Sequence, residues 1–204
     1  MLRHLQLTSV RSVLDIGCGL GEFLEQVGRM HPRIEMAGID IDERCLAVAR
    51  EHVDARFVKA AVERLPFGDE SYDLVTAIDV IEHLENPMQF LREALRVTRA
   101  QAVFVTPNLG RPARVLAAAR RRELREARGH KQGWDYHLFK QVLEVAGWRV
   151  DKIVTRFVDF PLYAFLPRRV GQFMSYRVLR RLFPMLGSEL FAFCSKPEVG
   201  DQCE

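Results

Sequence analysis

The chain has 204 residues, 48% of them hydrophobic and 28% charged, with a formal net charge of +3, so a single globular domain over residues 1–204 is expected. No stretch of about 18 apolar residues occurs, and the first residues, MLRHLQLTSV, lack the apolar core of a signal peptide, which predicts a cytoplasmic protein without a transmembrane helix. The four cysteines show no C-x-x-C spacing, which argues against a zinc site or a disulfide framework.

The first half of the sequence alternates apolar runs with helix-compatible segments, which predicts a parallel sheet with crossover helices. Strands are expected at 13–16, 34–39, 55–59, 72–77 and 102–106. Helices are expected near 22–30, 43–52 and 88–97. In the second half we expect, in order, a basic helical stretch near 112–128, a helix near 138–146, a strand near 149–157, an irregular helical segment, and a last strand near 190–195.

The first expected strand runs into a glycine-rich turn, VLDIGCGLGEF, with Gly17, Gly19 and Gly21 ahead of a helix. Glycines let the backbone turn tightly and approach a ligand, and a helix N-terminus presents free N–H groups. Asp15 within this stretch and Asp40 after the next apolar run add two acidic residues. The pattern predicts a cradle for a nucleotide-like cofactor.

The glycine spacing decides between cofactors. A dinucleotide site needs G-x-G-x-x-G, but the third glycine comes one residue early, and Glu22 stands in its place. The carboxylate of Asp15 would repel a pyrophosphate, whereas it would attract a cationic centre and an ammonium group. An NAD-dependent oxidoreductase is therefore disfavoured. The stretch resembles motif I of class I S-adenosylmethionine (SAM)-dependent methyltransferases, (D/E)-x-G-x-G-x-G.

Further segments resemble the same family: GIDID at 38–42, AAVERLPF at 60–67, YDLVTAIDVIEHLENP at 72–87, VTPN at 105–108, and Gly147–Trp148. The resemblance implies SAM as the cofactor. It also implies a Rossmann-like, doubly wound α/β fold, whose seven-stranded sheet is mostly parallel with an antiparallel last strand.

The resemblance also implies which residues contact SAM: Asp15, Gly17 and Gly19 at the methionyl part, Asp40 and Ile41 at the ribose and adenine, Val62 at the adenine edge, and Cys18, Ala61 and Asp79 in the remaining contacts. Asp40 is left for the ribose, because Asp42 is better placed to cap the following helix. Ala61 departs from the family, which usually has an Asp there that bonds the adenine amine. That contact must therefore come from elsewhere.

Asp79, Glu82 and His83 follow the fourth expected strand at a spacing that would place all three on one face of a helix. In one interpretation His83 is a general base that takes a proton from the methyl acceptor. In a second, the trio binds a metal with His137 as a further ligand, because small-RNA 2′-O-methyltransferases and some quinone O-methyltransferases carry a similar E-x-x-E-H motif. In a third, the Glu–His pair caps a turn. We predict no bound metal.

Trp134, Asp135, Tyr136, His137 and Phe139 follow the fifth expected strand, where the family usually forms its acceptor pocket. An aromatic wall there would hold a planar or apolar acceptor, with His137 assisting its deprotonation. The alternative is that these aromatic residues simply pack beneath a loop.

Two segments carry most of the basic charge: 109–132 has eight Lys or Arg and two Glu, and 161–187 has five Arg and no acidic residue. The family's N-terminal helices are not evident ahead of the first strand. Either the sequence is truncated there, or these insertions form a lid or the acceptor pocket, as we expect. A solvated helix remains the simpler interpretation of 109–132. Nucleic-acid binding is disfavoured, since aromatic residues for base stacking are not interleaved. Contact of 161–187 with a membrane surface has weaker support.

The sequence thus predicts a SAM-dependent methyltransferase that methylates an O, N or C atom of a small-molecule acceptor, with His83 and His137 as candidate catalytic residues. The stretches 96–110 and 134–138 also resemble MetW, a methyltransferase-like partner of a homoserine acyltransferase. A non-catalytic partner protein is therefore the alternative. The acceptor and the oligomeric state are left open.

Overall fold

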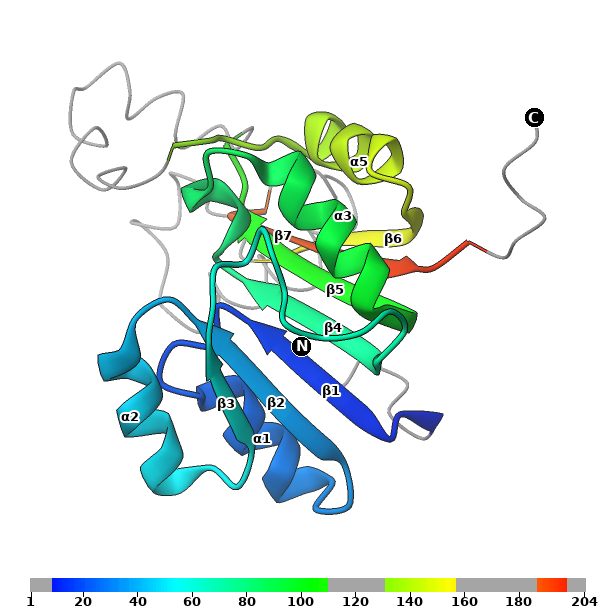
Figure 1. The fold of residues 1–204 in the computed structure, drawn as a ribbon. Coiled ribbons are helices and arrows are strands. Elements are labelled where there is room, and N and C mark those ends of the chain that lie inside the picture. Colours follow the sequence, from blue (N-terminus) through cyan, green and yellow to red (C-terminus); the bar gives the residue numbers. More distant parts are fainter. Residues whose placement is uncertain (1–8, 110–130, 157–186, 198–204) are drawn as a thin grey trace, which may run out of the picture.

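The computed structural model describes residues 9–109, 131–156 and 187–197, which form a seven-stranded sheet with helices on both faces (Figure 1). The strands are β1 Ser12–Ile16, β2 Glu35–Asp40, β3 Arg56–Lys59, β4 Tyr72–Ile78, β5 Thr98–Pro107, β6 Arg149–Arg156 and β7 Glu189–Ser195. The helices are α1 Glu22–Met30, α2 Glu43–His52, α3 Pro87–Val97 and α5 Tyr136–Val145, with a short 3₁₀ turn, η3, at Ile81–His83. The predicted basic helix near 112–128 and nearly all of the basic segment 161–187 lie outside the described residues.

The strand order is β3-β2-β1-β4-β5-β7-β6. The five strands from β3 to β5 are parallel, and β7 is antiparallel to both of its neighbours. This confirms the predicted doubly wound α/β fold with an antiparallel last strand. The winding reverses between β1 and β4, and ligands of such sheets bind at the carboxyl ends of the strands beside that point.

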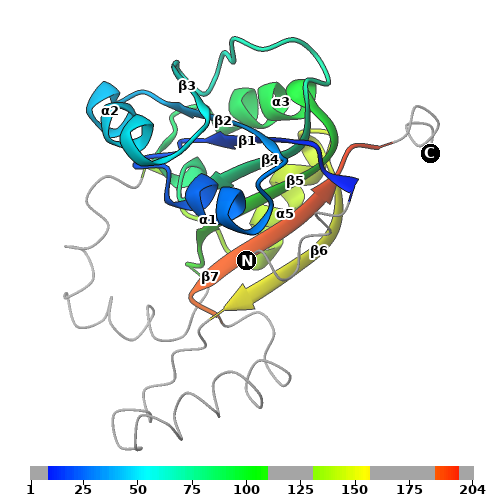
Figure 2. The ribbon, with the colours of Figure 1, turned by 90° about the horizontal axis from the view of Figure 1, so that it is seen from below.

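Two apolar cores fill the space between sheet and helices. On one face, Phe23, Leu24 and Val27 of α1 pack against strand residues that include Val13 and Leu74. On the other face, α3 and α5 bury side chains that include Phe90, Leu91, Phe139 and Leu143. Figure 2 shows α1 on one side of the sheet and α3 on the other. The apolar residues recur every three or four positions along each helix, as an amphipathic helix on a sheet requires.

Two elements begin at least two residues earlier than the sequence predicts. β5 starts at Thr98 rather than 102, because its first residues are polar and lack the apolar run by which the strand was predicted. Thr98 is nevertheless fully buried, and its hydroxyl donates to the Ala94 carbonyl at 2.6 Å. Helix α5 starts at Tyr136 rather than 138. The carboxylate of Asp135 accepts hydrogen bonds from the backbone N–H groups of His137 (2.8 Å) and Leu138 (2.9 Å), which caps the helix.

The connection between β3 and β4, residues 60–71, contains neither helix nor strand. Successive parallel strands are usually joined through a helix, whereas this segment crosses the sheet without the regular hydrogen bonding of a helix. It begins beside the end of β2, where the Ala60 N–H donates to the Asp40 carbonyl at 3.2 Å. Val62 and Leu65 then bury their side chains in the core that also contains α3.

Candidate functional site

The turn between β1 and α1 has the geometry of an open backbone cradle. Gly17, Gly19 and Gly21 have φ angles of 70°, 52° and 80°, in the left-handed region that favours glycine. A Cβ atom on Gly17 would collide with the side chain of Val80, which follows β4. A Cβ on Gly19 would meet no atom of the described residues within 4 Å. The turn is thus pressed against the end of β4 on one side and open on the other.

The carboxylate of Asp40 closes one side of this cradle. Its Oδ2 accepts a hydrogen bond from the Gly19 N–H at 2.9 Å, and its Oδ1 accepts one from the Asp42 N–H at 2.9 Å. Asp42 caps α2 through the Arg44 N–H, as predicted for this residue. The Asp40 side chain is half-buried, while Ile41 beside it is 68% exposed. Each Asp40 oxygen keeps acceptor capacity for a further donor.

Asp15 lies deeper than the cradle surface. It is 3% exposed, and its Oδ1 accepts a hydrogen bond from the Thr76 hydroxyl of β4 at 2.7 Å. Burial raises the pKa of Asp15 to about 7; the Thr76 hydrogen bond opposes this rise and the charge of Asp40 adds to it. Without a ligand, the Asp15 carboxyl group is therefore only partly ionised near neutral pH. The negative charge that the sequence leads us to expect beside the methionyl part is then only partly present.

Cys18 is held inside the turn. Its backbone N–H donates to the Ile39 carbonyl at 2.8 Å, and its carbonyl accepts from the Gly21 N–H at 2.9 Å. Its thiol packs where Gly38 leaves room, since a Cβ on Gly38 would lie 2.7 Å from the sulfur. Burial, with smaller contributions from Asp15 and Asp40, raises the pKa of the thiol to about 12. The residue shapes the turn as a small buried side chain.

The segment after β4 differs from the predicted single helical face. Asp79 has a φ of 54°, and only the 3₁₀ turn at Ile81–His83 follows it, so the i, i+3, i+4 spacing does not align the three side chains. Glu82 is 2% exposed and its Oε2 accepts from the Thr106 hydroxyl at 3.1 Å, whereas Asp79 and His83 are exposed. Burial raises the pKa of Glu82. In the part of the chain that the structure describes, no three Asp, Glu, His or Cys side chains gather to hold a metal ion.

The aromatic cluster after the fifth strand divides into two parts. Trp134 and Phe139 are buried core residues with ring centroids 6.2 Å apart, so for these two the packing interpretation is correct. His137 is exposed at the start of α5, with its ring edge-on to Tyr136 at 5.5 Å between centroids. The Leu109 N–H donates to the Trp134 carbonyl at 2.7 Å, which ties this segment to the carboxyl end of β5.

The remaining predicted cofactor residues lie after β3: Ala61 is exposed and Val62 is buried. Sequence reasoning missed Thr76 and Val80, the partners of Asp15 and Gly17. A polar residue inside the apolar run of β4 was the available signal for Thr76, because a buried hydroxyl needs a hydrogen-bond partner.

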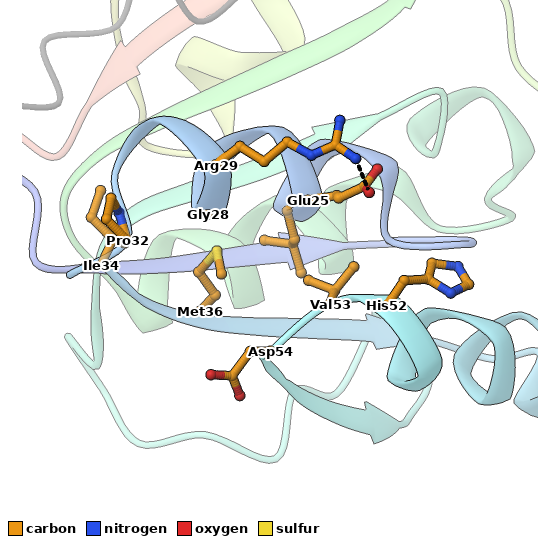
Figure 3. Close-up of a pocket in the computed structure, with 10 residues that line it drawn as sticks. Glu25, Gly28, Arg29, Pro32, Ile34, Met36, His52, Val53 and Asp54 are labelled. Atoms are coloured by element: carbon orange, nitrogen blue, oxygen red, sulfur yellow. Dashed lines mark hydrogen bonds and ion pairs between the residues drawn. The ribbon is translucent and has the colours of Figure 1, made fainter.

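Among the cavities of the described part of the chain, two lie at opposite ends of the strands. One of about 240 Å³ is lined by Glu22, Phe23, Gln26, Ile78, Asp79, Val105, Glu189 and Phe191, at the carboxyl ends of β4 and β5 beside the start of α1. The other, of about 430 Å³, lies between the end of α1, the start of β2 and the end of α2, with the Glu25–Arg29 ion pair (2.5 Å) at its side (Figure 3). The second cavity is the larger, but it lies away from the glycine turn, so the smaller one belongs to the candidate site.

Comparison with known proteins agrees with this geometry. Residues 14–106 match the family model described as "Methyltransferase domain". A curated Mycolicibacterium smegmatis protein, described as a probable SAM-dependent methyltransferase, is 37% identical over 105 residues, which are 48% of this chain and 38% of that one. The ubiquinone biosynthesis O-methyltransferase of Azorhizobium caulinodans is 31% identical over 112 residues, 52% of this chain and 44% of that one. The chain thus spans less than half the length of these relatives.

Among solved structures, a SAM-dependent methyltransferase from Archaeoglobus fulgidus superposes with a TM-score of 0.68 at 23% identity, over 93% of this chain and 88% of that one. At that identity the likeness concerns the fold. The sheet order, the left-handed glycine turn with its Asp40 anchor, and the match over residues 14–106 agree with one another. Residues 14–106 thus match a methyltransferase domain, and the chain has the fold of a solved SAM-dependent methyltransferase.

Proposed function

We propose that this protein transfers the methyl group of SAM to an O, N or C nucleophile of a small-molecule acceptor. The observation that carries the proposal is the Asp40 carboxylate, held by the Gly19 and Asp42 N–H groups at the edge of an open, left-handed glycine turn. A ligand with adjacent hydroxyl groups fits that carboxylate. Among the described residues no atom lies within 4 Å of a Cβ built on Gly19, which leaves room for the ligand to lie against the backbone.

When bound, SAM supplies an electrophilic methyl group on a sulfonium sulfur. The residues of this chain would bind and orient it. The two Asp40 oxygens would accept hydrogen bonds from the ribose hydroxyls, and the Gly17–Gly19 backbone would border the methionyl part. Asp15 beneath the turn gains charge when a cationic group lies near, because an opposite charge lowers a carboxyl pKa. Much of the rate would come from alignment of the acceptor and exclusion of water.

The acceptor is proposed to lie at the carboxyl edge of β4 and β5, where the 240 Å³ cavity borders Asp79. His83 and His137 are both exposed, so either can take a proton from an acceptor hydroxyl or amine. The Azorhizobium relative is an O-methyltransferase, which makes hydroxyl compounds the first acceptors to try.

Calorimetric titration with SAM tests the cofactor. Low-micromolar binding is expected for the wild type, and Asp40→Ala should weaken it at least about tenfold, because a hydrogen bond to a charged group contributes roughly 1.5–3 kcal/mol. Asp54→Ala is the matched control, since this exposed acid lines the cavity at the opposite end of the strands. No heat with the wild type, or equal affinity in Asp40→Ala, would refute the assignment. A screen of cell-extract fractions with tritiated SAM would then identify the acceptor.

The second candidate is a methyltransferase-like protein that acts by binding an acyltransferase. It is supported by the resemblance of 96–110 and 134–138 to MetW. Capture of an acyltransferase by the tagged chain, together with absence of methyl transfer to every extract fraction, would favour this candidate over the first.

A further inference from the structure

Arg96 and Glu93 form a two-point ion pair on α3. The Arg96 Nε donates to Glu93 Oε1 at 2.9 Å, and Nη2 donates to Oε2 at 2.8 Å. Their side chains are 31% and 21% exposed, so the pair is partly shielded from water. Only the planar guanidinium offers this parallel fork, which fixes the direction of both side chains.

The pair also makes hydrogen bonds to the 60–71 connection. Arg96 Nη1 donates to the Phe67 carbonyl at 2.8 Å and to Asp69 Oδ1 at 2.8 Å, and Nη2 donates to the Leu65 carbonyl at 3.1 Å. The Leu65 N–H in turn donates to Glu93 Oε2 at 3.0 Å.

Two more contacts extend the grip along the connection. The Glu70 N–H donates to the Arg96 carbonyl at 2.9 Å, and the Gln89 side chain donates to the Glu63 carbonyl at 3.2 Å. Helix α3 therefore makes hydrogen bonds to residues 63, 65, 67, 69 and 70 of the connection.

The connection depends on these contacts for its shape. It has no helix or strand of its own, and ordering such a backbone costs conformational entropy that α3 must offset. Its first residues leave from beside Asp40, and Ala61 and Val62 follow directly. Ala61 has no polar side chain, so an adenine placed there meets the backbone of the connection.

We propose that Arg96 and Glu93 are positioning residues for the cofactor, which set the backbone of the 60–71 connection so that it recognises the edge of the adenine base. This inference rests on the proposed function, because it takes SAM as the ligand. Neither side chain touches the cofactor; both act through the connection.

The test compares two ligands that differ at the base edge, S-adenosylhomocysteine and S-inosylhomocysteine. If loss of the ion pair leaves the connection in place in about one molecule in ten, the apparent Kd for S-adenosylhomocysteine rises about tenfold. Arg96→Ala, and Arg96→Lys, which keeps the charge but loses the fork, should both show this rise. In both variants the wild-type preference for adenine over hypoxanthine should fall towards one, and amide exchange in residues 60–71 should accelerate.

Arg92→Ala is the control, because Arg92 is an exposed arginine on the same helix and makes none of the contacts described above. It should bind and discriminate as the wild type does. The proposal is overturned if folded Arg96 variants keep wild-type affinity and preference, or if affinity falls while the preference stays, as general destabilisation would cause. A wild type without preference for adenine also overturns it.

If Arg96→Ala does not fold, Arg96→Lys and Glu93→Gln decide by the same criteria. A wild type that binds neither SAM nor S-adenosylhomocysteine refutes the proposed function, and the inference falls with it. A wild type that binds both, with Arg96 variants that behave like it, refutes the inference alone.

Discussion

Replacing Asp15 by Asn should stabilise the protein above neutral pH, because the wild type must keep a buried carboxylate charged there. Burial raises the pKa of Asp15 from 3.8 to about 7, so the folded state holds this proton more tightly than the unfolded state does. The corresponding part of the folding stability is present at low pH, declines as the pH rises from about 4 to about 7, and is absent above. At about 1.4 kcal/mol per unit of pKa, a shift of about three units corresponds to about 4 kcal/mol as an upper limit.

Urea unfolding of the wild type and Asp15→Asn between pH 5 and pH 9 measures this difference. Asn keeps a carbonyl that can accept the Thr76 hydrogen bond, so the two proteins differ mainly in charge. The stability advantage of the variant should grow up to about pH 7 and then level off, as the linkage relation requires. Other shifted groups, Glu82 among them, are common to both proteins and cancel in the difference.

An advantage that does not change with pH, or a variant less stable than the wild type at pH 8, would refute this reasoning. The exposed Asp54 provides the control, since Asp54→Asn removes the same charge outside the core.

Two further substitutions probe the frame around the site. Gly17→Ala should prevent tight SAM binding and lower the free energy of unfolding by on the order of 1–3 kcal/mol, since its Cβ would strike Val80 at a φ of 70°. Gly28→Ala is the control and should be nearly neutral in thermal or urea unfolding, because among the described residues its Cβ would approach the flexible end of Met36. Burial opposes ionisation of Asp73, but hydrogen bonds from the Arg11 N–H, Arg99 and the Ser12 N–H outweigh it, and the net effect lowers its pKa. Asp73→Asn should therefore destabilise the protein by about 1–3 kcal/mol at pH 7, and the loss should shrink as the pH falls through the folded-state pKa; equal loss at pH 3 and pH 7 would contradict this.

Local patterns predicted the frame of this protein well. The apolar runs, the glycine spacing and the acid after the second strand depend on neighbours in sequence, and the structure has strands and a left-handed turn where they predict them. The antiparallel last strand was predicted from the family resemblance. The prediction of one helical face after β4 was wrong, also for a local reason: the left-handed backbone at Asp79 breaks the helical spacing that the sequence suggests.

Contacts between segments far apart in the sequence could not be predicted from the sequence. Thr76 bonds Asp15 across 61 residues, and Arg96 bonds Leu65, Phe67 and Asp69 across 27 to 31 residues. Each depends on which strands lie side by side and how a helix crosses them, which is known only once the sheet has formed. Roles that the family resemblance gives to Ile41, Val62, His83 and His137 stay predictions, to be decided by binding and transfer assays.

Two internal breaks in the described part of the chain, after Leu109 and after Arg156, fall at the carboxyl edge of the sheet. The first is closed at its base by the Leu109–Trp134 hydrogen bond of 2.7 Å, and the second by the Ser188 N–H, which donates to the Arg156 carbonyl at 2.7 Å. A segment closed in this way can change in length at little cost, because closure entropy grows only slowly with loop size. The described fold can thus accept segments of different length at two places on that edge, while the glycine turn and its acidic anchor stay as they are.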